Sequence, residues 1–535
     1  MGKILKNSEL YTLVKQLSKS SPQAVFTPKD LTDSEPSTIF DYLYLETDIE
    51  KKYKLLLAEQ RESKVIIFLC GSSGDGKSAI IGQNQKFFDK YYDIHIDATH
   101  SFRPTQSAIE ALDERFAQFY QSDKSLVVGI NIGILLNFAR EGSDSHQNIK
   151  KAIEQYMRYG NSTNECHFIN FEDYSKFEMN QDKITSSFIR NLLDKVTDAR
   201  DSNPFYQAFE EDKANNITTR LHQNYQLLSH ESIKNNIVEL LVTVHLKYDQ
   251  FLTTRNILDF IYTILNGDNL LINALFEDKS NTIIENICKE DPCLFRTEKL
   301  DTFILERKSN QEDLALQEFL NEFNAQCQKP ILLEDNPHLL IRIFYLFRDQ
   351  SISNNFHQSF QQEFDDSTTY EFIKLLYAHR NGEKDTIYNF YESLEKAILA
   401  YANKRHPSLS DEGLMTLSEV NGYALCADVE FDPNWEELTK DKQHQLRSFD
   451  CALIVNKKAL ETIAISLSMY RLICAINEGY RPNKHDRNTI VIFEEMIENI
   501  IYLAKENNKL TIIHGDKSYE FKNNGDKIKV KSHVR

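Results

Sequence analysis

The sequence predicts an α/β domain with a parallel sheet, followed by a large mostly α-helical region and a small C-terminal β-meander. Three observations carry this prediction. Short β-prone runs alternate with longer amphipathic stretches between residues 65 and about 175, which is typical of βαβ units. Leucine, isoleucine and phenylalanine then recur at helical spacing from about 180 to 505. The last 30 residues hold short β-prone runs separated by glycine-containing turns, as expected for an antiparallel meander.

The domain boundaries follow these changes of pattern. A polar break at 18–37, rich in Ser, Thr, Pro and Asp, lies within the first helical segment, and Pro407 marks a second interruption. The predicted divisions are an N-terminal helical segment at residues 1–60, the α/β domain at 61–185, a helical lid or middle domain at 186–405, and a C-terminal helical domain ending in the meander at 406–535.

Composition excludes several classes of protein. Hydrophobic residues make up 41% of the chain and charged residues 27%, as in folded proteins rather than disordered ones. No apolar run approaches the roughly 18 residues that span a bilayer, so we expect a cytoplasmic protein with no membrane partner. The eight cysteines show no zinc-ligand spacing. A net charge of −18 opposes unaided binding to DNA, which favours a subunit that reaches DNA through an assembled complex.

The most specific motif is at residues 71–78, where Gly-Ser-Ser-Gly-Asp-Gly-Lys-Ser fits G-x-x-x-x-G-K-[ST]. A β-prone run at 65–70 precedes it and a helix candidate at 79–91 follows it. Glycines allow backbone N–H groups to face a β-phosphate, while Lys77 would reach the β- and γ-phosphates and Ser78 would bind Mg²⁺. The sequence therefore predicts an AAA/ASCE-like P-loop NTPase domain that uses ATP and Mg²⁺. The predicted cofactor-binding residues are Gly71, Ser72, Ser73, Gly74, Asp75, Gly76, Lys77, Ser78 and Ala79.

Such a loop needs an acid that holds the magnesium through water, usually at the end of a strand in the same sheet. Asp97, at the end of the run 92–97, is the predicted metal ligand and catalytic residue, with helix capping as the alternative role. Glu172 and Asp173 are the second choice. No adjacent pair of acids follows an apolar strand between the loop and residue 140. The sequence therefore indicates nucleotide binding and leaves hydrolysis open.

Two further residues are predicted to act near the γ-phosphate. Asn131 ends the run 125–131 and would orient the attacking water, and a turn asparagine is the alternative. Arg255 stands at a predicted helix start after Thr253 and would reach the γ-phosphate from a helical lid, and a surface arginine is the alternative. We identify no nuclease motif in this chain.

Several longer segments accompany the phosphate loop. They read Ile-Asp-Ala-Thr-His-Ser-Phe at 96–102, Gly-Ile-Asn-Ile-Gly-Ile-Leu-Leu-Asn-Phe at 129–138, Leu-Thr-Thr-Arg-Asn-Ile-Leu-Asp-Phe-Ile-Tyr at 252–262, Asp-Pro at 291–292, Leu-Asp at 300–301 and Gly-Tyr-Arg-Pro at 479–482. With these segments the chain resembles, over nearly its whole length, the DptF (DndF) family of DNA phosphorothioation-dependent restriction proteins.

The resemblance implies a function in anti-phage defence. In that system a sulfur replaces a non-bridging phosphate oxygen of host DNA, and DptF acts with DptG and DptH to restrict DNA without the mark. This chain would then be an ATPase subunit with DptG-like and DptH-like partners, and self-association is left open. His100 stands where an acid is expected in some relatives, which puts hydrolysis in doubt. The alternatives are a nucleotide-binding scaffold with little hydrolysis, or an AAA-like ATPase of an unrelated process.

Overall fold

A computed structural model describes most of the chain, and its contacts divide the chain into two compact units. The described residues are 8–20, 39–96, 106–309, 312–326, 336–350, 354–438, 446–482, 487–523, 525 and 527–534. The first unit comprises residues 1–178, 185–245 and 250–365, and the second comprises 179–184, 246–249 and 366–535.

A four-stranded parallel sheet forms the centre of the α/β part of the first unit. Its strands are β1 (Ile66–Cys70), β2 (Tyr92–His95), β3 (Ser125–Ile130) and β4 (Cys166–Asn170), in the order β2-β3-β1-β4. Every residue of β1 and β3 is buried, as expected for central strands covered on both faces. The predicted strands and their parallel arrangement are thereby confirmed. Because all four strands run in the same direction, their carboxyl ends share one edge of the sheet.

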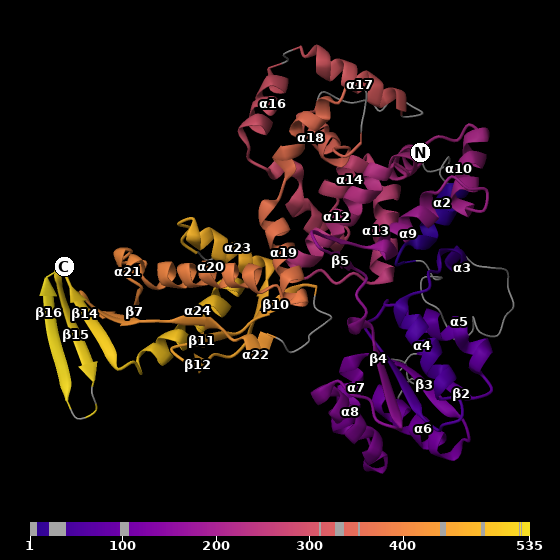
Figure 1. Cartoon of the computed structure of the whole chain (residues 1–535). Helices are drawn as coiled ribbons and strands as arrows, with labels where there is room; N and C mark the ends of the chain where they lie inside the picture. Colours follow the sequence, from indigo (N-terminus) through magenta and orange to yellow (C-terminus); the bar gives the residue numbers. More distant parts are fainter. Residues whose placement is uncertain are drawn as a thin grey trace. The chain divides into compact units, whose positions relative to one another are not determined.

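Helices cover both faces of this sheet (Figure 1). On one face, α6 (Ala108–Gln121), α7 (Ile132–Glu141) and α8 (Gln147–Tyr159) pack against alternate residues of β1 and β3, including Phe68 and Val128. On the other face, α4 (Asp48–Glu59) and α5 (Lys77–Phe88) pack against the intervening residues, including Ile67 and Val127. The two-residue period of a strand sends successive side chains into opposite layers, so two apolar cores hold the sheet in place.

Gly129 of β3 permits a close approach of β2. A methyl group added at Gly129 would lie 2.3 Å from the carbonyl oxygen of Ile96 and 3.1 Å from Cδ1 of Ile81. We therefore expect Gly129→Ala to lower the free energy of unfolding by about 1–3 kcal/mol, because a backbone atom must move. Gly267→Ala is the matched control, since its nearest neighbour lies at 3.6 Å. Equal urea midpoints for both variants would contradict this packing.

The rest of the first unit is helical, as predicted. N-terminal helix α2 (Glu9–Val14) packs against α10, and Ser8 donates a hydrogen bond to Asp212 at 2.6 Å. The remaining helices are α3 (Ile39–Leu43), α9 (Ser187–Thr197), α10 (Pro204–Ala214), α11 (Arg220–Leu228), α12 (Glu231–Tyr248), α13 (Thr254–Asn266), α14 (Leu271–Glu277), α15 (Thr282–Ile287), α16 (Glu298–Lys308), α17 (Leu314–Gln326) and α18 (Pro337–Leu346). Short 3₁₀ turns connect several of them, of which Phe356–Phe364 is the longest.

The second unit contains more strand than the sequence led us to expect. Its helices are α19 (Ser367–Asn381), α20 (Lys384–Ala402), α21 (Ser408–Asp411), α22 (Trp435–Leu438), α23 (Leu467–Asn477) and α24 (Arg487–Ala504). Its strands are β7 (Leu414–Val420), β8 (Tyr423–Asp428), β9 (Phe431–Pro433), β10 (Ser448–Cys451), β11 (Leu453–Val455), β12 (Lys458–Ala459), β13 (Ile463–Ser466), β14 (Lys509–His514), β15 (Lys517–Asn523) and β16 (Ile528–Val534). The small β5 (Glu178–Asn180) and β6 (Lys183–Thr185) form a separate hairpin.

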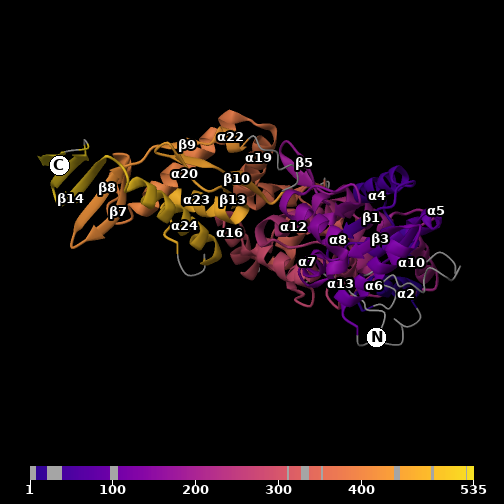
Figure 2. The same ribbon diagram turned by 90° about the horizontal axis from the view of Figure 1, so that it is seen from below.

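The prediction of a mostly helical chain up to residue 505 is wrong for residues 414–466. The sheet in the order β16-β15-β14-β8-β7 joins the predicted meander to an unpredicted hairpin. Figure 2 shows β14 next to the two strands of this hairpin, β7 and β8. The meander itself is confirmed, because β14, β15 and β16 pair antiparallel in sequence order. The hairpin supplies the buried side of β14, since Ile513 packs with Ala424 and Cys426 of β8.

Candidate functional site

The loop at residues 71–78 joins the central strand β1 to helix α5 at the carboxyl edge of the sheet. The backbone N–H of Gly71 donates to the carbonyl of Ile130 at 3.1 Å, which fixes the start of the loop on β3. Gly74 and Gly76 have φ values of +87° and +105°, a conformation that L side chains rarely adopt. Gly76 is the residue before α5 and has no side chain to cap it. The first-turn N–H groups of α5 therefore have the arrangement that favours an anion.

The Lys77 side chain bends back over the loop. Its ammonium group donates to the carbonyl oxygens of Gly71 at 2.9 Å and Ser72 at 2.7 Å. Lys77 also acts electrostatically on Cys70, where burial raises the thiol pKa to about 12 and Lys77 opposes the rise. The loop therefore contributes one cation, the Lys77 ammonium, which lies over the loop backbone. Cys70, which precedes the loop, is a neutral thiol.

The residues that follow β4 also lie at the carboxyl edge of the sheet, next to the start of the loop. A methyl group at Gly71 would lie 2.9 Å from Cδ2 of Phe171, so the start of the loop rests on this ring. Phe171 opens a 3₁₀ turn, Phe171–Asp173, in which Glu172 and Asp173 are exposed. Asp173 raises the pKa of the Cys70 thiol, which places its charge within electrostatic range of the end of β1. The second choice for the magnesium-holding acid therefore lies at the same edge as the loop.

The preferred acid, Asp97, lies outside the described residues, as does His100. The backbone that leads to Asp97 is described. Ile96 is buried, and its carbonyl is the oxygen that a methyl group at Gly129 would meet. Strand β2 belongs to the same sheet as β1 and lies two positions from it in the strand order. The role of Asp97 stays a prediction.

Asn131 lies between β3 and α7, and β3 pairs with β1, the strand that precedes the loop at residues 71–78, as predicted. Its side-chain oxygen accepts the N–H of Gly133 at 2.7 Å and caps α7. This local role is the turn alternative given above. Orientation of a water molecule by the same carboxamide stays a prediction.

Arg255 reaches the loop from a segment far away in sequence. Its backbone N–H donates to the carbonyl of Gly74 at 3.4 Å. A methyl group at Gly74 would lie 3.1 Å from Cβ of Arg255 and 3.2 Å from Oγ1 of Thr253. Thr253 is buried and caps α13 by accepting the N–H of Asn256 at 3.1 Å. The start of α13 is therefore packed directly on the loop, and the predicted contribution of the Arg255 side chain stays a prediction.

Two residues at this edge make a contact that the motif does not indicate, and of the two only Asp75 belongs to the motif. The Asp75 carboxylate is buried beneath the loop, where it accepts the N–H of Ser72 at 2.6 Å. The Lys176 ammonium lies 3.9 Å from Asp75 Oδ1. Lys176 follows β4 by six residues in a polar stretch, and no sequence signal separates it from a surface lysine.

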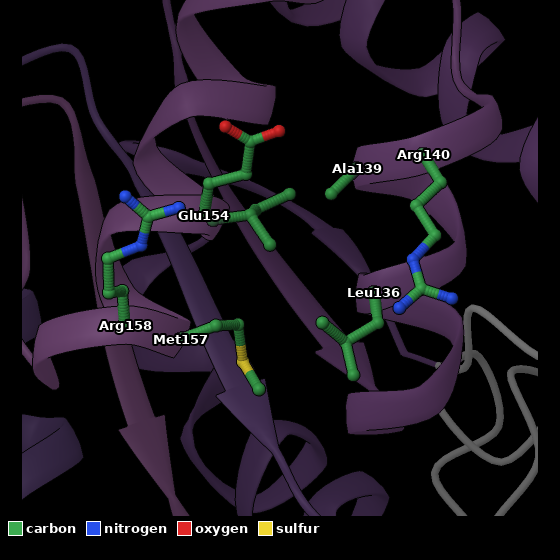
Figure 3. Close-up of a pocket in the computed structure, with 7 residues that line it drawn as sticks. Leu136, Ala139, Arg140, Glu154, Met157 and Arg158 are labelled. Atoms are coloured by element: carbon green, nitrogen blue, oxygen red, sulfur yellow. The ribbon is translucent and has the colours of Figure 1, made fainter.

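A shallow hollow of about 440 Å³ lies between α7 and α8, away from the loop residues (Figure 3). Its lining residues are Leu136, Ala139, Arg140, Ile153, Glu154, Met157 and Arg158. In Figure 3, Leu136 and Arg140 lie across from Met157 and Arg158. The hollow is open and contains none of the predicted cofactor-binding residues, so it contributes nothing to the site at the loop.

The described part of the chain contains no group of three His, Cys, Asp or Glu side chains placed to hold a metal ion. Across the same residues, no helix is both long and apolar enough to cross a bilayer. Comparison of the chain with known protein families, with curated proteins and with solved structures found no match.

Proposed function

We propose that this protein is a P-loop NTPase that binds ATP with Mg²⁺ at residues 71–78. One observation carries the proposal: a glycine loop with two left-handed glycines connects a buried central parallel strand to the start of a helix, with a lysine ammonium lying over the loop. This combination supplies N–H donors, a helix N-terminus and a cation to one phosphate chain.

The residues present fit both ATP and Mg²⁺. Backbone N–H groups of the loop and the Lys77 ammonium would hold the β- and γ-phosphates, and Ser78 and Asp97 would hold Mg²⁺. A bound Mg²⁺ neutralises phosphate charge during transfer. The start of α13 gives Arg255 a base directly on the loop, from which a guanidinium group can recognise a phosphate.

The particular proposal is an ATP-hydrolysing subunit of a phosphorothioation-dependent DNA restriction complex, with DptG-like and DptH-like partners. The resemblance to the DptF family supports it. Three of the segments that carry this resemblance meet at the loop, namely residues 71–78, the end of β3 with α7, and the start of α13. These three segments occur in one sequence for a shared physical reason, since each contributes residues to the same edge of the sheet.

A scaffold that binds ATP and hydrolyses it slowly is the second candidate. The observation that favours it is that the Asn131 carboxamide already serves as a helix cap, which competes with a role in orienting water. Single-turnover ATP hydrolysis, with and without duplex DNA and the partner subunits, separates the two. Turnover that DNA and partners stimulate supports the hydrolase. Stoichiometric binding with no turnover in any mixture supports the scaffold.

The isolated chain should bind duplex DNA more weakly than about 1 μM at physiological salt, because its total charge is −18 and phosphate neutralisation dominates such affinity. The exposed strand β16 carries the local basic residues Lys529 and Lys531. Truncation before β14 would remove buried Ile513, so substitution is the better test. Submicromolar, salt-dependent binding that is lost in Lys529→Gln/Lys531→Gln would contradict the proposal of partner-dependent binding. Changes at the exposed lysines 151 and 396 provide the control.

A further inference from the structure

The Asp75 side chain stabilises the backbone of the loop from within. The residue is 4% exposed, and its carboxylate accepts the N–H of Ser72 through Oδ2 at 2.6 Å. A methyl group added at Gly71 would lie 3.0 Å from the same oxygen. Asp75 therefore closes the first turn of the loop with a charge-assisted hydrogen bond, and the geometry of the N–H groups beyond it depends on this contact.

Lys176 is the counter-charge of this carboxylate. Its Nζ lies 3.9 Å from Asp75 Oδ1, and its side chain is 19% exposed. Within the described residues, Asp75 Oδ1 is buried without a hydrogen bond, so the ion pair is its stabilising contact. The backbone around Lys176 is itself fixed, because its carbonyl accepts the Ser186 hydroxyl at 2.6 Å and Ser186 caps α9.

Burial disfavours the charged form of both Asp75 and Lys176 when either stands without the other. Burial raises the pKa of Asp75, while Lys176, the Ser72 N–H and Lys77 act in the opposite direction. Burial lowers the pKa of Lys176, and Asp75 opposes that change. Removal of one member of such a pair leaves the other as a buried charge without compensation, which is more costly than removal of both. The two residues should therefore be energetically coupled.

We infer that Lys176 is a positioning residue of the nucleotide site, which holds Asp75 ionised beneath the loop and thereby keeps the loop in its phosphate-binding conformation. The inference rests on the proposed function for its consequence in ATP binding. Its structural part, the coupling of Lys176 to the loop backbone through Asp75, stands without nucleotide. Lys176 itself touches no phosphate in this assignment.

A double-mutant cycle tests the inference in the full chain. Lys176→Met should weaken binding of a fluorescent ATP analogue by about 10- to 100-fold. Lys176→Arg keeps the charge and should retain most of the affinity. The double variant Lys176→Met/Asp75→Asn should bind at least about threefold more tightly than Lys176→Met, because the buried charge is gone and asparagine still accepts the Ser72 N–H. Lys151→Met, at an exposed position on α8, is the control for lysine loss.

A pH series distinguishes this role from general loss of structure. Without Lys176 the pKa of Asp75 rises further, so protonation at lower pH removes the unpaired charge. The affinity of Lys176→Met should therefore recover as the pH falls from about 8 to about 6, and this dependence should vanish in the double variant. A pH-independent defect, or a double variant as weak as Lys176→Met, would overturn the inference.

Hydrogen exchange of the nucleotide-free protein separates this inference from the proposed function. Lys176→Met should speed exchange of amides in peptides covering residues 71–78, and the double variant should restore it. If the wild type binds no nucleotide but this exchange pattern is found, the proposed function fails and the positioning role stands. If amides of residues 71–78 exchange at the same rate in Lys176→Met as in the wild type, the positioning role is overturned even if ATP binds.

Discussion

Replacement of Lys77 by alanine should weaken ATP binding by at least about 100-fold without unfolding the protein. The ammonium group now bonds two loop carbonyls, and in the nucleotide complex we expect it to bond β- and γ-phosphate oxygens. Each charge-assisted hydrogen bond contributes about 1.5–3 kcal/mol, so the loss of two of them accounts for this factor. Titration of a fluorescent ATP analogue into wild type and variant measures the change.

A lysine on the exposed face of α8 provides the matched control. Lys151→Ala removes the same charge from the same α/β part and should leave the affinity unchanged. The melting temperatures of all three proteins should agree within a few degrees, because Lys77 is not part of either apolar core of the sheet. Equal ATP affinity of wild type and Lys77→Ala would eliminate residues 71–78 as the phosphate site.

The second large effect is expected at Asp97. Asp97→Asn should lower Mg²⁺-dependent ATP turnover by about 100-fold while it changes ATP affinity by no more than about threefold. Asparagine has the same size as aspartate and lacks the charge that would hold the water shell of the ion. Steady-state hydrolysis with Mg²⁺, measured beside analogue binding, separates the two quantities.

Two other aspartates sharpen this test. Asp93 lies on β2, in contact with Ser122 and Lys124, and Asp93→Asn should leave turnover unchanged. Asp173→Asn changes the second carboxylate at the loop edge. If Asp97→Asn retains turnover within about twofold and Asp173→Asn loses it, the magnesium role belongs to the turn after β4.

The strands and the loop of the α/β part could be predicted from sequence because short segments, apolar runs and glycine spacings, determine them. The apolar runs 65–70 and 125–131 are the observed β1 and β3 within one residue at each end, since a buried strand must be apolar throughout. The glycine spacing at 71–78 predicted a turn into a helix. The structure has this turn before α5, and two of its glycines have the left-handed conformation that glycine adopts most readily. The meander was predicted in the same way from its turns.

Contacts between distant segments could not be read from such patterns. Nothing local to Arg255 shows that its N–H meets the carbonyl of Gly74, 181 residues earlier in the numbering, and the Lys176–Asp75 pair is equally hidden. The hairpin of β7 and β8 was not predicted although the sequence contains a turn signal for it. Asn421 and Gly422 both have positive φ between β7 and β8, the conformation that an Asn-Gly turn favours.

Hydrogen exchange with and without ATP and Mg²⁺ reports where the nucleotide binds, and it therefore tests whether residues 71–78 form the nucleotide site. We expect slower amide exchange in peptides that cover residues 66–80, and a smaller protection at the start of α13, which packs on Gly74. Lys77→Ala should abolish both effects. Protection elsewhere with none at residues 66–80, or no protection at millimolar ATP, would contradict the assignment of this loop as the nucleotide site.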